Sequence, residues 1–282
     1  KDYVATFEVP YEAGTLKAVT NAGEQVLTSA SGKVGISIEA EPNCKMVNGQ
    51  WSMVNEHKAG ELIFLDINLT GENGEVVRPR ARKSLAEQLS RVKDKAEVFT
   101  PSWVCNAQNN LVDEAWFGRP DVFNRPDPDN PQEWIDTEAD IVFPDTEGKT
   151  WKDYVAARRL EITCGEAPYL VSRYDTVSGE PIRNLRHRIG LLDRKLIVVG
   201  QNTTTTAEWL LWAKIALRAT YGFEWQGDNL LLAREALFVT FMEYYFEKFG
   251  KLLGEGEMKG AAYIISWNLW QMDGLKYGLP GY

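Results

Sequence analysis

The spacing of apolar residues changes between Arg78 and Ser84, and this change decides what each part of the chain can fold into. Before it, apolar and polar residues alternate in three runs, at residues 3–9, 34–38 and 63–69. Alternation with period two is typical of strands with one buried face. Asn73-Gly74 has the composition of a type I′ hairpin turn. We therefore predict a small antiparallel β fragment of sandwich type over residues 1–80, with fewer than the roughly seven strands of a complete sandwich.

From Lys83 onward the spacing is helical. Ser84 and Glu87 have the spacing of a capping box. Thr100 followed by Pro101 indicates an N-cap and first helical position, for a helix that should end at Gly118. Further helices are predicted at residues 206–220 and 229–249, a buried strand near Leu160, a turn at 221–224 and a last strand at 263–270. Alternation of strands with long helices favours a parallel α/β sheet.

Cysteine and histidine are scarce, and this excludes several kinds of site. The chain has 282 residues, three cysteines without a CxxC pair, and two histidines. These numbers argue against a disulfide scaffold, a His-based zinc site and a Ser-His-Asp triad, so we expect no metal. The sparse, odd cysteine count favours a reducing compartment, so we expect a cytoplasmic protein. Because no apolar run of about 18 residues occurs, we expect no membrane contact.

The formal net charge of -9 means that any surface for binding DNA must be local. The best candidate is the stretch from Arg183 to Lys195, which carries five basic residues. An exposed charged hairpin is the alternative for this stretch, with His187 on the solvated surface.

The segment from Leu160 to Leu170 has the features of a ligand-binding loop. It is predicted to be a strand that runs into a tight turn at Gly165. A glycine just past a strand lets backbone N–H groups approach a ligand closely. Glu166, directly after it, could meet a cationic group of the same ligand.

Four segments follow one another in the same order as the motifs of one known family. They are Glu97-Val98-Phe99-Thr100-Pro101, Glu161 to Ala167, Tyr221-Gly222-Phe223-Glu224 and Ile264 to Leu275. Together, over about residues 83–282, they resemble bacterial DNA adenine-N6 methyltransferases of restriction–modification systems (restriction endonuclease subunit M). The resemblance implies an incomplete Rossmann-like methyltransferase core that binds S-adenosyl-L-methionine. It also implies double-stranded DNA as the partner of the full-length protein, and a restriction or specificity subunit as a further partner.

The resemblance also implies a role for each matching residue. Phe99, Thr100 and Pro101 would pack against the methionine part of the cofactor. Glu161, Cys164 and Gly165 match the family's Asp/Glu-Pro-x-Cys-Gly-x-Gly loop, from which Thr163 and Ala167 depart. Glu224, with Asp228 as the alternative, would bind the ribose hydroxyls at the end of the second strand. Asp273 would accept the adenine amino group, with Met272 where the family commonly has glycine.

One element of the family is missing. Its Asn/Asp-Pro-Pro-Tyr/Phe tetrapeptide, which holds the flipped target base, does not occur in this sequence. The closest segment is Leu279-Pro280-Gly281-Tyr282, which lacks the Asn and the second Pro. The catalytic residues are therefore unknown, and we expect this chain to be inactive alone.

The first 80 residues resemble a different family. Asp2 to Val19 and Leu62 to Pro79 are similar to strands of the accessory β-sandwich domains of glycoside hydrolase family 2 enzymes, which are β-galactosidase-like. The resemblance implies that residues 1–80 are a small antiparallel β Ig-like sandwich fragment. No part of a catalytic barrel is included. Two alternatives to a methyltransferase follow: a non-catalytic accessory module of such an enzyme, or a fusion of unrelated fragments.

Overall fold

The chain forms two compact units, Lys1–Val77 and Arg78–Tyr282. The computed structural model describes residues 4–7, 15–20, 23–28, 35–40, 43–47, 50–54, 65–70, 77–274, 276 and 278. The second unit begins slightly before the predicted start at residue 83. The reason is that the preceding turn is already bonded to it: the Arg80 N–H donates to Glu166, and Lys83 forms an ion pair with Asp228.

The first unit is built from antiparallel strand pairs. A three-stranded sheet has the order β1-β4-β7, from β1 (Val4–Phe7), β4 (Gly35–Ala40) and β7 (Leu65–Thr70). Two hairpins complete the described strands: β2 (Thr15–Thr20) with β3 (Gly23–Thr28), and β5 (Asn43–Val47) with β6 (Gln50–Val54). Each of the three runs with period two overlaps one strand of the sheet. The predicted turn at Asn73-Gly74 lies outside the described residues.

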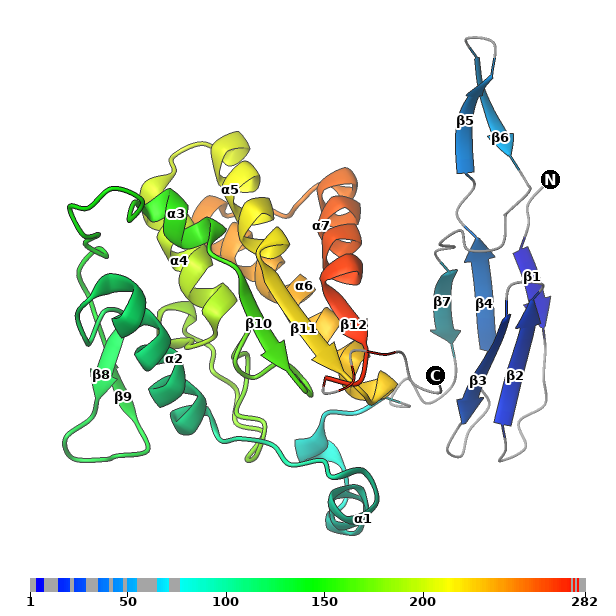
Figure 1. Cartoon of the computed structure of the whole chain (residues 1–282), viewed down its shortest axis with the longest axis horizontal. Helices are drawn as coiled ribbons and strands as arrows, with labels where there is room; N and C mark the ends of the chain where they lie inside the picture. The colour runs from blue at the N-terminus through cyan, green and yellow to red at the C-terminus, as the bar shows by residue number, and fades with distance from the viewer. Residues whose placement is uncertain are drawn as a thin grey trace. The chain divides into compact units, whose positions relative to one another are not determined.

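The second unit is centred on a parallel sheet with the order β10-β11-β12 (Figure 1). Its strands are β10 (Arg159–Ile162), β11 (Thr220–Glu224) and β12 (Leu269–Gln271). Two helices separate β10 from β11, α4 (Leu191–Asn202) and α5 (Thr206–Arg218). Two more separate β11 from β12, α6 (Gly227–Phe249) and α7 (Glu255–Asn268). Because the strands are parallel, their carboxyl ends meet at one edge.

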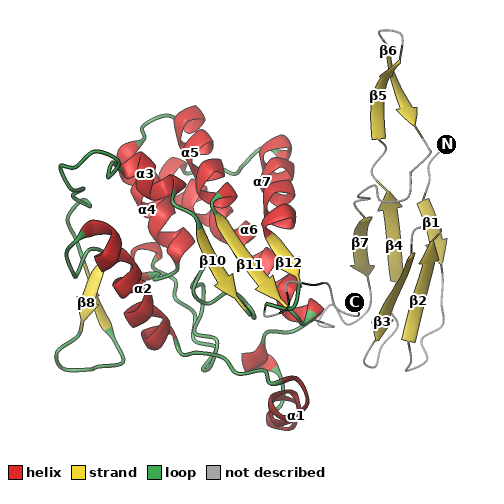
Figure 2. Cartoon of the chain, viewed as in Figure 1, coloured by secondary structure: helices red, strands yellow, loops and turns green. Residues whose placement is uncertain are grey.

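The remaining elements precede or flank this sheet (Figure 2). They are η1 (Arg80–Arg82), α1 (Leu85–Lys95), α2 (Ser102–Phe117), the hairpin of β8 (Asn124–Pro126) and β9 (Trp134–Asp136), α3 (Trp151–Ala156) and η2 (Leu185–His187). The capping box at Ser84 and Glu87 is present and begins α1. Gly118, with φ of 72°, ends α2 as predicted. No helix in the described part of the chain is long and apolar enough to cross a membrane.

The two faces of the sheet differ in burial. Thr220, Gly222 and Glu224 of β11 are buried, whereas the residues between them are only half-buried. Leu160 and Ile162 share the half-buried face and are 47% and 44% exposed. The prediction of a buried strand at Leu160 is therefore wrong, because its apolar side chains lie on the more exposed face.

Thr100 does not cap α2. The cap position is taken by Pro101, which makes no side-chain cap bond, and the helix begins at Ser102. The Ser102 N–H instead donates to Asp175 Oδ2 at 2.6 Å. A carboxylate distant in sequence thus satisfies the free N–H that the Thr100 hydroxyl was predicted to bind.

Two further predicted elements have a different structure. Residues 263–268 are the last turns of α7, whose buried residues Ala261, Ile264, Ile265 and Asn268 have helical spacing. Only Leu269–Gln271 is strand. Tyr221-Gly222-Phe223-Glu224 is part of β11 and not a turn, because it pairs with strands on both sides.

Candidate functional site

Glu224 connects the carboxyl end of β11 to the loop after β10. Its Oε2 accepts the Gly165 N–H at 2.8 Å, and its Oε1 accepts the Gln226 N–H at 2.9 Å. The Cys164 N–H donates to the Phe223 carbonyl at 2.8 Å in the same place. Since a carboxylate has about four acceptor positions, Glu224 retains two for a further donor. Glu224, the acid implied for the ribose, therefore lies beside residues 163–167, the loop after β10 that contains Gly165 (the glycine loop).

Phe99 packs directly on Gly165. A Cβ at residue 165 would lie 3.0 Å from Phe99 Cε1, and the residue has a φ of +55°. Both observations favour glycine here. Phe99 is buried, and the carbonyl oxygen of the next residue, Thr100, accepts a hydrogen bond from Thr176 Oγ1 at 3.1 Å. Phe99 thus borders the loop that contains Gly165.

Asp273 follows β12 and lies near the end of β11. The Met272 N–H donates to the Glu224 carbonyl at 2.9 Å, which fixes the chain one residue before Asp273. Asp273 Oδ1 accepts the Lys276 N–H at 3.0 Å, and the side chain is half-buried. Four of the predicted positions, Phe99, Gly165, Glu224 and Asp273, therefore lie around one edge of the sheet.

Glu161 and Cys164 lie on the buried side of the sheet. Burial raises the pKa of Glu161 well above its ordinary value, the nearby Glu224 adds to the rise, and hydrogen bonds from the backbone of Tyr169 and Leu170 oppose it. Its Oε2 has no hydrogen-bond partner within the described residues. Burial also raises the pKa of the Cys164 thiol, which makes this cysteine a packing residue and a poor nucleophile.

Two residues of the glycine loop that are not glycine have a left-handed backbone conformation, which favours glycine. Thr163 and Ala167 have φ angles of 57° and 63°. Non-glycine residues rarely adopt this region. Ala167 stands where the family's loop has its second glycine, so the backbone conformation suits glycine although the side chain differs.

Glu166 is not free to meet a ligand. It is buried, its Oε1 accepts the Arg80 N–H at 2.6 Å, and its Oε2 accepts the Tyr174 hydroxyl at 2.5 Å. Burial raises its pKa. The expectation that Glu166 meets a cationic ligand is therefore wrong, since both of its oxygens bind groups of the chain itself.

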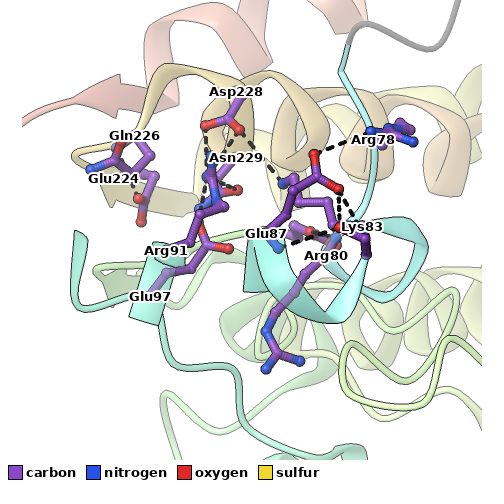
Figure 3. Close-up of polar contacts among 12 residues, drawn as sticks. Arg78, Arg80, Lys83, Glu87, Arg91, Glu97, Glu224, Gln226, Asp228 and Asn229 are labelled. Carbon is purple, nitrogen blue, oxygen red and sulfur yellow. Dashed lines mark hydrogen bonds and ion pairs between the residues drawn. The ribbon is translucent and has the colours of Figure 1, made fainter. Parts of the chain in front are cut away.

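Asp228, the alternative acid for the ribose, belongs to an ion-pair cluster (Figure 3). Arg91 on α1 binds Asp228 at 2.9 Å and also pairs with Glu97, while Lys83 lies 3.6 Å from Asp228. Asn229 Nδ2 donates to Glu97 Oε2 at 3.1 Å. This cluster holds α1 against the start of α6. It was missed from the sequence because its members lie far apart along the chain.

The basic stretch from Arg183 to Lys195 forms neither a DNA-binding face nor an exposed hairpin. Its last residues begin α4, where Arg194 is fully buried and binds Asp113 at 2.6 Å. Arg188 is also buried and pairs with Glu243 at 2.6 Å. Lys195 donates to two helix-terminal carbonyls, and burial lowers its pKa to about 7.

His187 is likewise not a solvated surface residue. Its ring stacks on Trp134 with centroids 4.5 Å apart. Its Nδ1 lies 3.0 Å from Asp136 Oδ2, and this hydrogen bond raises the pKa of His187. The histidine thus joins η2 to the β8–β9 hairpin. Within the described residues, no group of His, Cys, Asp and Glu side chains could hold a metal ion.

Comparison with known proteins gives no match. We find none among protein-family models, among curated proteins, or among solved structures. The two resemblances therefore rest on the sequence segments themselves.

Proposed function

We propose that the second unit is the S-adenosyl-L-methionine-binding part of a DNA adenine-N6 methyltransferase of a restriction–modification system, with an incomplete Rossmann-like core. One observation carries the proposal. Phe99, Gly165 and Glu224, which are far apart in sequence, are in contact or adjacent at the carboxyl ends of parallel strands. Ligands of open α/β sheets bind at this edge.

The residues present fit the roles proposed for them. Because Gly165 has no Cβ, Phe99 can lie directly against the backbone of this loop. The Phe99 ring would pack on the methionine part of the cofactor. Glu224 has acceptor positions left for ribose hydroxyls. Asp273, next to the residue bonded to Glu224, would accept the adenine amino group. The glycine-like backbone at Ala167 adds support.

Bound cofactor would supply an activated methyl group for transfer to a target amino nitrogen. The residues of this chain would bind and orient the donor. We assign no catalytic residue, because the sequence has no Asn-Pro-Pro-Tyr segment. The proposal extends to double-stranded DNA and a restriction or specificity subunit as partners of the full-length protein, and to a cytoplasmic location.

Replacing Asp273 with alanine should weaken S-adenosyl-L-methionine binding about 10-fold, since one hydrogen bond to the ligand would be lost. Isothermal titration calorimetry of the full chain measures this. Asp140, an exposed aspartate with no ion pair or hydrogen bond described, provides the control Asp140→Ala, which should bind like the unmodified chain. No heat of binding at high micromolar cofactor, or equal affinity in all three proteins, would refute the proposal.

For the first unit we propose a non-catalytic role, as a fragment similar to accessory domains of glycoside hydrolase family 2. Its separation as a compact antiparallel unit supports treating it apart from the cofactor site. A fusion of unrelated fragments is the alternative origin of the two-part chain.

A further inference from the structure

Arg80 lies beside the candidate cofactor site and is held there by its own backbone. Its N–H donates to Glu166 Oε1, the side chain directly after Gly165. Its guanidinium carbon lies 5.7 Å from the centre of the Phe99 ring. Phe99 in turn packs on Gly165. The guanidinium is thus fixed next to the aromatic ring that the proposed function assigns to the methionine part of the ligand.

Unlike Arg78, Lys83 and Arg91, Arg80 has no acid described in the structure that pairs with its side chain. Arg78 pairs with Glu87 at 3.3 Å, and Lys83 and Arg91 both pair with Asp228. The Arg80 Nε is buried without a hydrogen-bond partner among the described residues. Figure 3 shows the Arg80 side chain pointing away from the other labelled residues. A buried guanidinium N–H without an acceptor is costly unless a ligand supplies one.

Several acids also lie at this edge. Glu224 is the last residue of β11, Asp273 follows β12, and the carboxylate of Glu166 is occupied. An anionic ligand group would be repelled by this set without a nearby cation. A guanidinium near the face of an aromatic ring keeps donors available, and its planar donors match a carboxylate in bidentate geometry.

We propose that Arg80 binds the carboxylate of the amino-acid part of the ligand held at Phe99 and Gly165. This inference rests on the proposed function, since it takes S-adenosyl-L-methionine as the ligand. It makes Arg80, which lies outside all four motif segments, the residue that distinguishes amino-acid-bearing nucleosides from those without a carboxylate.

The test compares two ligands that differ only in that carboxylate, S-adenosyl-L-methionine and its decarboxylated form. Calorimetry is run on the full chain, on Arg80→Gln and on Arg82→Gln. Arg82 is in the same turn and exposed, so it is the matched control. We expect the unmodified chain and Arg82→Gln to bind the carboxylated ligand at least about 10-fold more tightly than the other. Arg80→Gln should lose this preference and bind the decarboxylated ligand unchanged.

The outcomes separate this inference from the proposed function. If Arg80→Gln keeps the preference, or loses affinity for both ligands equally, Arg80 does not bind the carboxylate, while the cofactor proposal stands. If the unmodified chain binds neither ligand, both fail. Equal melting temperatures of Arg80→Gln and Arg82→Gln would show that the variants are folded alike.

Discussion

Replacing Asp113 with alanine is expected to destabilise the second unit by about 3–5 kcal/mol, the cost of leaving a buried charge without its partner. Asp113 on α2 is the only acid described within ion-pair distance of Arg194 on α4, at 2.6 Å, and both side chains are buried. Asp113 also accepts the Tyr154 hydroxyl at 2.8 Å, while Arg194 binds the side-chain oxygens of Asn106 and Asn110. Loss of the carboxylate would leave two buried donors unsatisfied.

Urea unfolding of the full chain, followed by tryptophan fluorescence, measures this change. Most of the tryptophans lie after residue 78, so the signal reports chiefly on the second unit. Glu114→Ala, an exposed acid next to Asp113 on the same helix, should change the free energy of unfolding by less than about 0.5 kcal/mol. Similar midpoints for Asp113→Ala and Glu114→Ala would show that the buried ion pair contributes nothing specific.

Replacing Gly165 with alanine should have the second-largest effect, and it acts on the site itself. The new Cβ would lie 3.0 Å from the Phe99 ring, in a backbone with φ of +55°. Left-handed strain costs about 1–2 kcal/mol, and displacement of Phe99 adds to it. We also expect S-adenosyl-L-methionine affinity to fall at least 10-fold, because Phe99 and the loop backbone would both shift.

The variant Gly148→Ala separates the effect of backbone strain from the effect of the contact between an added Cβ and Phe99. Gly148 has a φ of +75°, but an added Cβ would meet no atom within 4 Å. This variant should lose only the strain energy and should bind cofactor normally, as seen by urea unfolding and calorimetry. If Gly165→Ala and Gly148→Ala behave alike in both measurements, the Phe99–Gly165 contact has no role in binding.

Local signals in the sequence predicted local structure well. The capping box at Ser84, the end of α2 at Gly118 and the helix ending at Phe249 are all present. They depend on neighbouring residues alone. The positions Phe99, Gly165 and Glu224 were chosen from motif order, and the structure brings them together.

Features that depend on distant residues could not be predicted. The N–H of Ser102 is bound by Asp175, and Arg194 is buried because Asp113 on another helix neutralises it. The apolar run at residues 263–270 is short enough to fit a helix or a strand, and packing decides for α7. Arg80 belongs to none of the sequence motifs. Its position beside Phe99 depends on the hydrogen bond from its backbone N–H to Glu166.

Amide hydrogen exchange of the full chain, with and without S-adenosyl-L-methionine, tests most directly that the cofactor binds at the carboxyl ends of β10, β11 and β12. We predict slower exchange in three separate segments on adding cofactor: 97–100, 163–167 and 271–274. Exchange in residues 1–77 should not change. Unchanged exchange at saturating cofactor, or protection confined to residues outside these segments, would contradict the account.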